Sequence, residues 1–165
     1  MLIVEDGTGL PGAEAYVSVA VADAYHAAFG NGAWAAATDP AKESAIRRAT
    51  QYIDSHYTFA GEPLTTTQAL SWPRVLSDLP SSKYAWPVKR VQDACAELAL
   101  RALSGTLYAD VSDALVKSET IGPISVEYSV GAQSGQTRFA VVDELLRDVL
   151  RGGGSRFGIR LERAS

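Results

Sequence analysis

Side chains that commonly carry out chemistry are sparse in this chain. Its only histidines are His26 and His56, and its one cysteine is Cys95. The histidines fall on different predicted helices without the HExxH-like spacing of a helical metal site, so we expect each to be a helix-surface or helix-end residue. Cys95 lies within an apolar helical pattern, where a buried thiol acts as a small hydrophobic residue, whereas a reactive thiol needs an exposed, electropositive site.

Two further patterns also argue against catalysis. Residues 152–155 read Gly-Gly-Gly-Ser, which lacks the GxxxxGK[ST] order of a phosphate-binding loop and follows a predicted helix instead of opening one. The carboxylates fall mainly on predicted outer helix faces, where solvation is their default role. We therefore expect that the chain is not an enzyme and uses no metal or cofactor.

The aromatic residues raise the question of base stacking. Trp72 and Trp86 each precede a proline at the predicted boundary of an element. Grooves that bind single strands usually interleave aromatic residues with a track of Lys and Arg, and the sequence around these tryptophans lacks such a track. We expect them to pack at the end of a helical bundle.

The composition indicates one globular domain. The chain has 165 residues, of which 47% are hydrophobic and 21% are charged. Its net charge of −4 argues against a general nucleic-acid binder, although it still allows a local basic patch. A single cysteine excludes an internal disulfide. The first residues lack the basic region of a signal peptide, and no apolar run has the length of a membrane span.

The element predicted to organise the fold is a long helix between Trp86 and Gly105. Pro87 suits the first helical position, and Gly105 suits a left-handed stop. Glu97 precedes Arg101 by four residues, the favourable order for a surface pair. Apolar residues recur at steps of three and four, as in a helix with a broad buried face: Val88, Val91, Ala94, Cys95, Leu98, Ala99, Ala102 and Leu103.

Four other segments have helical patterns. Ser18 caps a helix that runs through Phe29 and stops at Gly30, and Asp39-Pro40 opens a helix that runs to about His56. The last helix runs from Phe139 to about Leu150, and residues 33–37, with Trp34, form one short helical turn. The residues expected on the buried faces are Val21, Ala22, Tyr25, Ala28, Phe29, Ala45, Ile46, Ala49, Ile53, Tyr57, Val142, Leu145, Leu146, Val149 and Leu150. The expected surface pairs are Glu43 with Arg47 and Asp143 with Arg147.

The C-terminal third contains the only strand patterns. Residues 116–121 and 124–129 alternate apolar with polar around Gly122-Pro123, which predicts a β-hairpin. After the glycine-rich hinge, apolar and polar residues alternate again in the tail. That tail is either a disordered end or a strand that adds to the sheet of another chain. The predicted organisation is a mainly α bundle over residues 1–151, with one hairpin, and an extended arm over residues 152–165.

The combined motifs resemble a known family. They are 4–9 (VEDGTG), 15–18 (AYVS), 49–54 (ATQYID), 68–74 (QALSWPR), 94–99 (ACAELA), and 116–119 (VKSE) with 121–124 (IGPI). Over about residues 1–150 the chain resembles a tailed-phage and prophage family labelled "putative DnaT-like single-stranded-DNA-binding protein". In layout it is similar to the head–tail adaptor (connector) proteins of long-tailed bacteriophages.

The likeness to adaptors implies a structural virion protein of the phage neck. Such a protein forms a dodecameric ring of itself between the portal protein and a stopper or tail-terminator protein, and packaged DNA passes through its channel without specific binding. Its location is the virion, after synthesis in the host cytoplasm, with no membrane involved. The tail residues expected to bind the portal are Arg156, Phe157, Ile159, Arg160, Leu161 and Arg163. The alternative is a DnaT-like module that binds single-stranded DNA.

Overall fold

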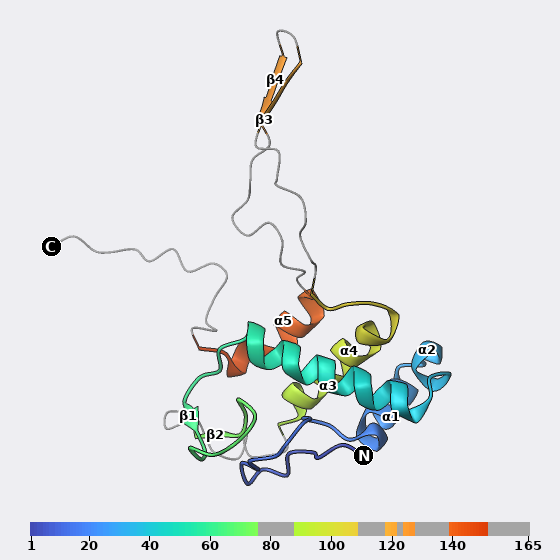
Figure 1. The fold of residues 1–165 in the computed structure, drawn as a ribbon, viewed down its shortest axis with the longest axis vertical. Helices are drawn as coiled ribbons and strands as arrows, with labels where there is room; N and C mark the ends of the chain where they lie inside the picture. Colours follow the sequence, from blue (N-terminus) through green and yellow to red (C-terminus); the bar gives the residue numbers. More distant parts are fainter. Residues whose placement is uncertain (76–87, 109–117, 122–123, 128–138, 152–165) are drawn as a thin grey trace, which may run out of the picture.

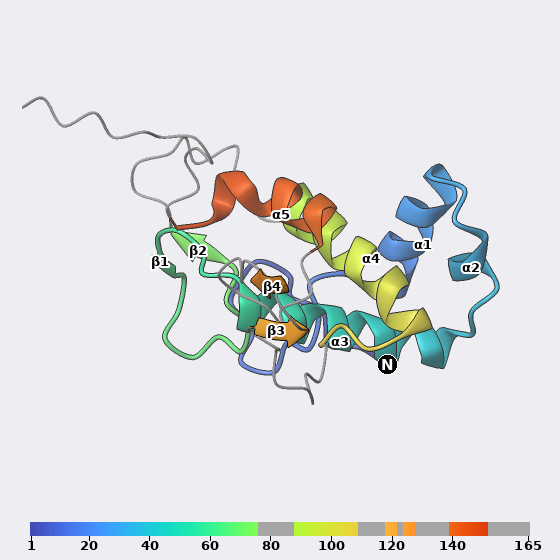
Figure 2. The same cartoon turned by 90° about the horizontal axis from the view of Figure 1, so that it is seen from above.

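Two long helices, α3 and α4, form the centre of the fold. The computed structural model describes residues 1–75, 88–108, 118–121, 124–127 and 139–151. Helix α3 (Asp39–His56) and helix α4 (Lys89–Ser104) lie side by side and share the most extensive contact among the described elements (Figure 1). Helix α5 (Ala140–Leu146), continued by the 3-10 turn η2 (Arg147–Val149), packs on α4, so that α4 lies between α3 and α5 (Figure 2).

Helix α1 (Val19–Ala28) and the short helix α2 (Gly32–Ala35) complete the bundle. Ser18 caps α1 as predicted, because its side chain accepts a hydrogen bond from the backbone N–H of Val21. Gly30 ends the helix at φ +68°, a left-handed conformation that glycine adopts at little cost. The mainly α fold class is therefore confirmed.

Short antiparallel strand pairs account for the described β-structure. Strand β1 (Glu62–Pro63) pairs with β2 (Arg74–Val75) in a segment for which the sequence predicted no strands. Strand β3 (Ser118–Ile121) pairs with β4 (Ile124–Glu127). The predicted hairpin is thus confirmed over these residues, and positions 116–117 and 128–129 of the predicted strands lie outside the described residues.

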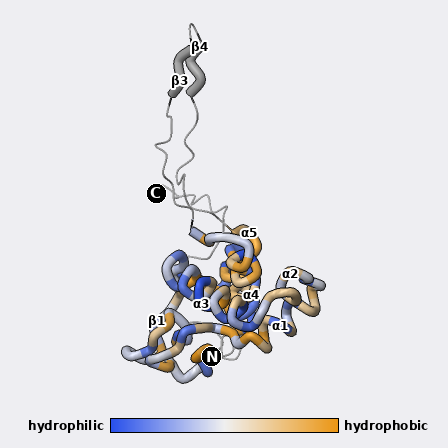
Figure 3. Tube along the Cα trace, turned by 45° about the vertical axis from the view of Figure 1, so that its right-hand side comes forward, coloured by the Kyte–Doolittle hydropathy of each residue, from blue (hydrophilic) through white to orange (hydrophobic). Residues whose placement is uncertain are grey.

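The core contains the residues that the period of α4 selected. Val91, Cys95 and Leu98 are fully buried, together with the alanines of the same face. The small alanine side chains allow α3 to lie close against this face. Hydrophobic and hydrophilic residues alternate along α4 and α5 in Figure 3, as expected for helices with one buried face.

The helix ends differ slightly from the sequence prediction. Thr38 is the N-cap of α3, so Asp39 is already helical. Helix α4 begins at Lys89 after Val88, two residues later than predicted. Gly105 has an extended backbone, with φ near −178°, and the predicted left-handed stop is wrong. Propensity marks helix ends only to within a residue or two, since tertiary contacts decide the last turn.

The predicted buried face of α1 is also wrong in part. Val21 and Phe29 are 43% and 66% exposed, whereas Ala22 and His26 are buried. On α1, His26 is buried against the carbonyl oxygen of Ala96 in α4, and Val21 and Phe29 are left at the surface. The predicted pair of Asp143 with Arg147 is also absent: Arg147 of η2 pairs with Glu144 at 2.6 Å instead, while Asp143 accepts a hydrogen bond from the Tyr57 hydroxyl at 2.7 Å.

A buried carboxylate organises the N-terminal loop. Glu5 is 2% exposed, and its side chain accepts hydrogen bonds from the backbone N–H groups of Gly7, Gly9 and Leu10 at 2.8 to 2.9 Å. Gly9 has φ +77°, and a Cβ there would lie 2.9 Å from the Thr65 hydroxyl. The Glu5 carboxylate therefore holds this loop together, and the Asp6 carboxylate adds a hydrogen bond from the backbone N–H of Thr8 at 3.0 Å.

Several predicted features lie outside the described residues. They are Pro87, Trp86, the hinge at 152–155 and the arm residues Arg156, Phe157, Ile159, Arg160, Leu161 and Arg163. Over the parts of the chain that the structure describes, no helix is both long enough and apolar enough to cross a membrane.

Candidate nucleic-acid interface

His26 is a buried structural residue, and its predicted surface position is wrong. It is 1% exposed, and its Nε2 lies 3.1 Å from the carbonyl oxygen of Ala96 in α4. Its Nδ1 lies 2.9 Å from the side-chain amide of Asn31, a pairing that places the ring proton on Nε2. Burial lowers the pKa of His26. Both ring nitrogens are occupied, so the residue locks α1 to α4.

A cavity of about 490 Å³ lies next to His26, lined by residues of α1, α2 and α3. The Asp23 carboxylate at its edge accepts hydrogen bonds from Trp34 Nε1 at 2.7 Å and from Lys42 Nζ at 2.8 Å. These contacts satisfy the indole and hold the buried ammonium beside its counter-charge. Asp23, Trp34 and Lys42 therefore have a structural role, because their polar groups are already paired with one another.

Cys95 and Trp72 are buried, as the sequence predicted. Cys95 is fully buried with its sulfur 3.5 Å from the Thr50 hydroxyl, and burial raises the pKa of its thiol to about 12. Such a thiol is protonated at neutral pH and unsuited to nucleophilic attack. Trp72 is also fully buried and contacts Phe59 edge to face.

A group of aromatic rings lies at the C-terminal end of α3. Tyr52 and His56 are stacked, with ring centroids 3.9 Å apart and an angle of 10° between the planes. Tyr108 lies over both, 5.3 Å from Tyr52 and 5.1 Å from His56, and Phe139 lies 5.4 Å from Tyr52. We call these four residues the aromatic cluster.

The elements place these rings at different depths. Tyr52 and His56 share one side of α3 because they are four residues apart. Tyr52 is 3% exposed and anchors the cluster, whereas Tyr108 is 38% exposed. The Tyr108 hydroxyl lies 2.7 Å from Ser55 Oγ, which orients its ring against the helix. Tyr108 therefore offers a positioned aromatic surface to solvent.

One arginine, Arg101, packs against the aromatic cluster. The Arg101 guanidinium lies 5.7 Å from the centroid of the Phe139 ring and pairs with Glu97 at 2.6 Å. Interleaved aromatic and cationic groups are typical of grooves that bind single strands, in which bases stack and phosphates meet cations. The chain does bring such groups together, although they are far apart in the sequence.

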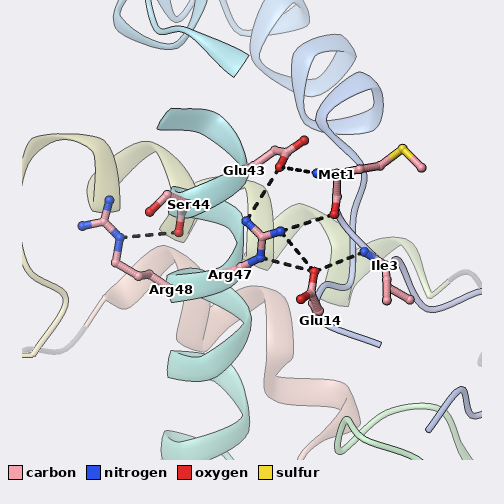
Figure 4. Close-up of polar contacts among 7 residues, drawn as sticks. All are labelled: Met1, Ile3, Glu14, Glu43, Ser44, Arg47 and Arg48. Carbon is pink, nitrogen blue, oxygen red and sulfur yellow. Dashed lines mark hydrogen bonds and ion pairs between the residues drawn. The ribbon is translucent and has the colours of Figure 1, made fainter. Parts of the chain in front are cut away.

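Arg48 is the cation best placed to meet a phosphate. Figure 4 contrasts it with its neighbour Arg47, whose guanidinium lies between Glu14 at 3.1 Å and Glu43 at 3.7 Å. Arg48 points away from that network, and its contact in the figure is the carbonyl oxygen of Ser44 at 3.5 Å. No carboxylate among the described residues lies within ion-pair distance of Arg48.

Arg48 and the exposed ring lie along one strip of α3. Ser55 follows Arg48 by seven residues, or two helical turns, which places the two side chains in line and roughly 10 Å apart along the axis. Arg48 and Ser55 are exposed, and His56 is half-buried. We call Arg48, Ser55, His56 and Tyr108 the α3 surface. It combines an unpaired cation, an exposed ring and a hydroxyl, and these groups can bind phosphate and stack on a base.

Sequence reasoning missed this site. Tyr108 lies 53 residues from Ser55, and Phe139 is farther still along the chain, so no local spacing signals their meeting. The spacing of Arg48, Tyr52 and His56 on one predicted helix was the only available clue. Within the described segments, no group of three or more His, Cys, Asp or Glu side chains could hold a metal ion.

Comparison with known proteins gives one match. A family model described as "Putative DnaT-like ssDNA binding protein" matches residues 1–164. No curated protein and no solved structure matches the chain.

This match corrects the adaptor interpretation. The matched family is described by single-stranded DNA binding, so the predicted head–tail adaptor and its virion role are wrong. The predicted partners are wrong for the same reason, namely the portal, the stopper or tail terminator, a dodecameric ring, and DNA that passes without binding. The adaptor was favoured because the net charge argued against DNA binding, but net charge does not describe a local surface such as the one that carries Arg48 and Tyr108. The location in the cell stays a prediction.

Proposed function

The chain belongs to the family of putative DnaT-like single-stranded-DNA-binding proteins, and on this premise we propose that it binds single-stranded DNA through the α3 surface. The observation that carries the proposal is the family match, which spans nearly the whole chain. The α3 surface supports it by supplying the two groups that such binding needs.

Tyr108 is the stacking residue in this proposal. Its ring is held by Ser55 and backed by Tyr52 and His56, so little conformational freedom is lost when a base stacks on it. Stacking on an aromatic ring contributes about 1–3 kcal/mol per base. Every base has a flat face, and this contact alone therefore carries little sequence preference.

Arg48 is the phosphate-binding residue. Its guanidinium has no carboxylate partner among the described side chains, so no existing ion pair has to break when a phosphate binds. With a net charge of −4, the protein has little long-range attraction for DNA. Binding then depends on few charge contacts, and one phosphate contact predicts a slope of log K against log salt of about −0.7 for a single strand.

The proposal includes no catalytic step. Cys95 is buried and protonated at neutral pH, and both ring nitrogens of His26 are occupied within the fold. These observations favour action by binding over acid–base or nucleophilic catalysis.

The test is a fluorescence-anisotropy titration of the purified chain with a labelled oligo(dT), over a series of salt concentrations. Arg48→Ala is compared with Arg147→Ala, which removes the same charge from η2, where Arg147 already pairs with Glu144 of α5. We expect Arg48→Ala to weaken binding several-fold and to flatten the salt slope, while Arg147→Ala binds like the unchanged protein. A duplex of the same length should bind more weakly, because its bases are not free to stack.

Two results would contradict the proposal. If the folded protein binds no oligonucleotide at low salt, the function is wrong. If binding occurs but Arg48→Ala and Arg147→Ala behave alike, DNA binding stands and its assignment to the α3 surface is wrong.

A further inference from the structure

A groove of about 380 Å³ runs beside the α3 surface. One wall is a face of α3 formed by Arg47, Thr50, Gln51, Asp54 and Ser55. The opposite wall is formed by Glu14 and Leu70 from two loops. The groove is continuous with the α3 surface, because Ser55 lines it and also contacts the Tyr108 hydroxyl. Its volume lies within the usual range of small-molecule sites and exceeds that of a single nucleobase.

Gln51 is the polar residue of this groove whose side chain is not committed to the fold. It is exposed, and no hydrogen bond to its side-chain amide occurs among the described residues. By contrast, Asp54 accepts hydrogen bonds from the Tyr16 hydroxyl and, at 3.2 Å, from the backbone N–H of Ser71. Arg47 is engaged by Glu14 and Glu43 (Figure 4). The groove thus has a fixed polar frame and one free amide.

A side-chain amide of this kind can form a bidentate pair with the N6 and N7 edge of adenine. Its oxygen accepts from the amino group N6 of adenine, while its nitrogen donates to N7. Thymine offers a carbonyl oxygen in place of the amino group, and the carboxylates of Glu14 and Asp54 in the same groove repel such an oxygen. The lining therefore favours a base that carries an amino group next to an acceptor nitrogen.

We propose that this groove binds one adenine base of the single strand, and that Gln51 reads its N6 and N7 edge. The inference rests on the proposed function, and it assigns a base preference to a protein whose stacking contact has none. A strand that stacks one base on Tyr108 and meets Arg48 with a phosphate passes the groove mouth at Ser55, where the neighbouring base can enter.

The test uses a short oligo(dT) and the same oligonucleotide with a single central adenine. One substituted base avoids the self-stacking of oligo(dA), which would otherwise compete with the protein. We expect the adenine-containing strand to bind at least about fivefold more tightly, the lower end for a bidentate amide–adenine contact. Gln51→Ala should reduce the affinity for the adenine strand to that for oligo(dT).

Two further variants sharpen the test. Gln51→Glu keeps an acceptor and loses the donor, and it should shift the preference from a central adenine to a central cytosine, whose N4 amino group a carboxylate accepts from. Arg48→Ala is the control: it should weaken binding of all strands by one common factor and preserve the preference, since it contacts phosphate alone.

The outcomes separate this inference from the function on which it rests. If the protein binds all strands equally, or if Gln51→Ala keeps the adenine preference, the groove assignment is overturned and single-strand binding stands. If no strand binds, both fail. A preference for adenine that Gln51→Ala abolishes and Arg48→Ala preserves supports the inference.

Discussion

Replacement of Tyr108 by alanine tests whether the aromatic cluster is a DNA-binding surface. The ring is 38% exposed, so part of its area is already covered by Tyr52 and His56. We therefore take the lower part of the stacking range, about 1–2 kcal/mol, which corresponds to a loss of affinity of roughly 5- to 30-fold. The measurement is the same anisotropy titration against oligo(dT).

Stability has to be followed in the same experiment. Tyr108→Ala also removes two ring contacts within the protein, each contributing about 0.5–1.5 kcal/mol. For a chain of this size, that loss lowers the midpoint of thermal unfolding by roughly 3 to 10 °C. Circular dichroism at the titration temperature establishes that the variant is folded, so that lost affinity is not lost structure.

Two controls isolate the ring. Tyr108→Phe keeps the stacking face and loses the hydroxyl, with its contacts to Ser55 Oγ at 2.7 Å and to the carbonyl oxygen of Gln51 at 3.5 Å, so its affinity should fall less than threefold. This limit corresponds to about 0.6 kcal/mol. Phe29→Ala removes an aromatic ring that is 66% exposed on α1, away from the α3 surface, and should leave affinity unchanged. If folded Tyr108→Ala binds oligo(dT) as well as the unchanged protein, or if Phe29→Ala weakens binding more, Tyr108 is not the stacking residue.

Two further predictions concern the scaffold that positions the site. Glu5→Ala leaves the backbone N–H groups of the N-terminal loop without their buried acceptor, and it should lower the free energy of unfolding by about 3–5 kcal/mol in chemical denaturation. The control Glu144→Ala removes an exposed carboxylate of α5 and should change that free energy by less than about 1 kcal/mol. Equal effects of the two variants would contradict the role of Glu5 as the acceptor that holds the loop. Burial lowers the pKa of His26 in the folded protein below its ordinary value of 6.5. As the pH falls, the unfolded chain therefore takes up the His26 proton before the folded protein does. The free energy of unfolding should then decrease below about pH 6.5, by at most about 1.4 kcal/mol per pH unit. His26→Gln should make that dependence flatter between pH 7 and 5.5, and an unchanged slope would show that His26 does not titrate in this way.

Much of the fold follows from local patterns. The three- and four-residue spacing along α4 selects its buried face, because an apolar stripe on a helix has one low-energy orientation against a core. Ser18 as a cap and the hairpin of β3 and β4 follow from short-range chemistry in the same way. The burial of Cys95 and Trp72 could also be predicted, since both lie in strongly apolar settings.

Other features depend on contacts between distant segments. The sequence placed His26 at the surface, but the carbonyl of Ala96 and the amide of Asn31 bury it. The acidic net charge turned the functional interpretation toward a channel protein, and the family match reversed it. Net charge sums over the whole surface, whereas a binding site depends on the few groups that meet at one place.

Local sequence patterns are thus enough to predict most of the helices, the buried face of α4 and the sparseness of catalytic groups. Tertiary packing is needed to bring Tyr108 against Ser55, to leave Arg48 outside the ion pairs of Arg47, and to open a groove beside Gln51. Helical periodicity depends on residues three or four positions apart. The contact of Tyr108 with Ser55 joins residues 53 positions apart, and the groove joins α3 to Glu14 and Leu70, so both depend on how the burial of apolar surface packs distant segments together.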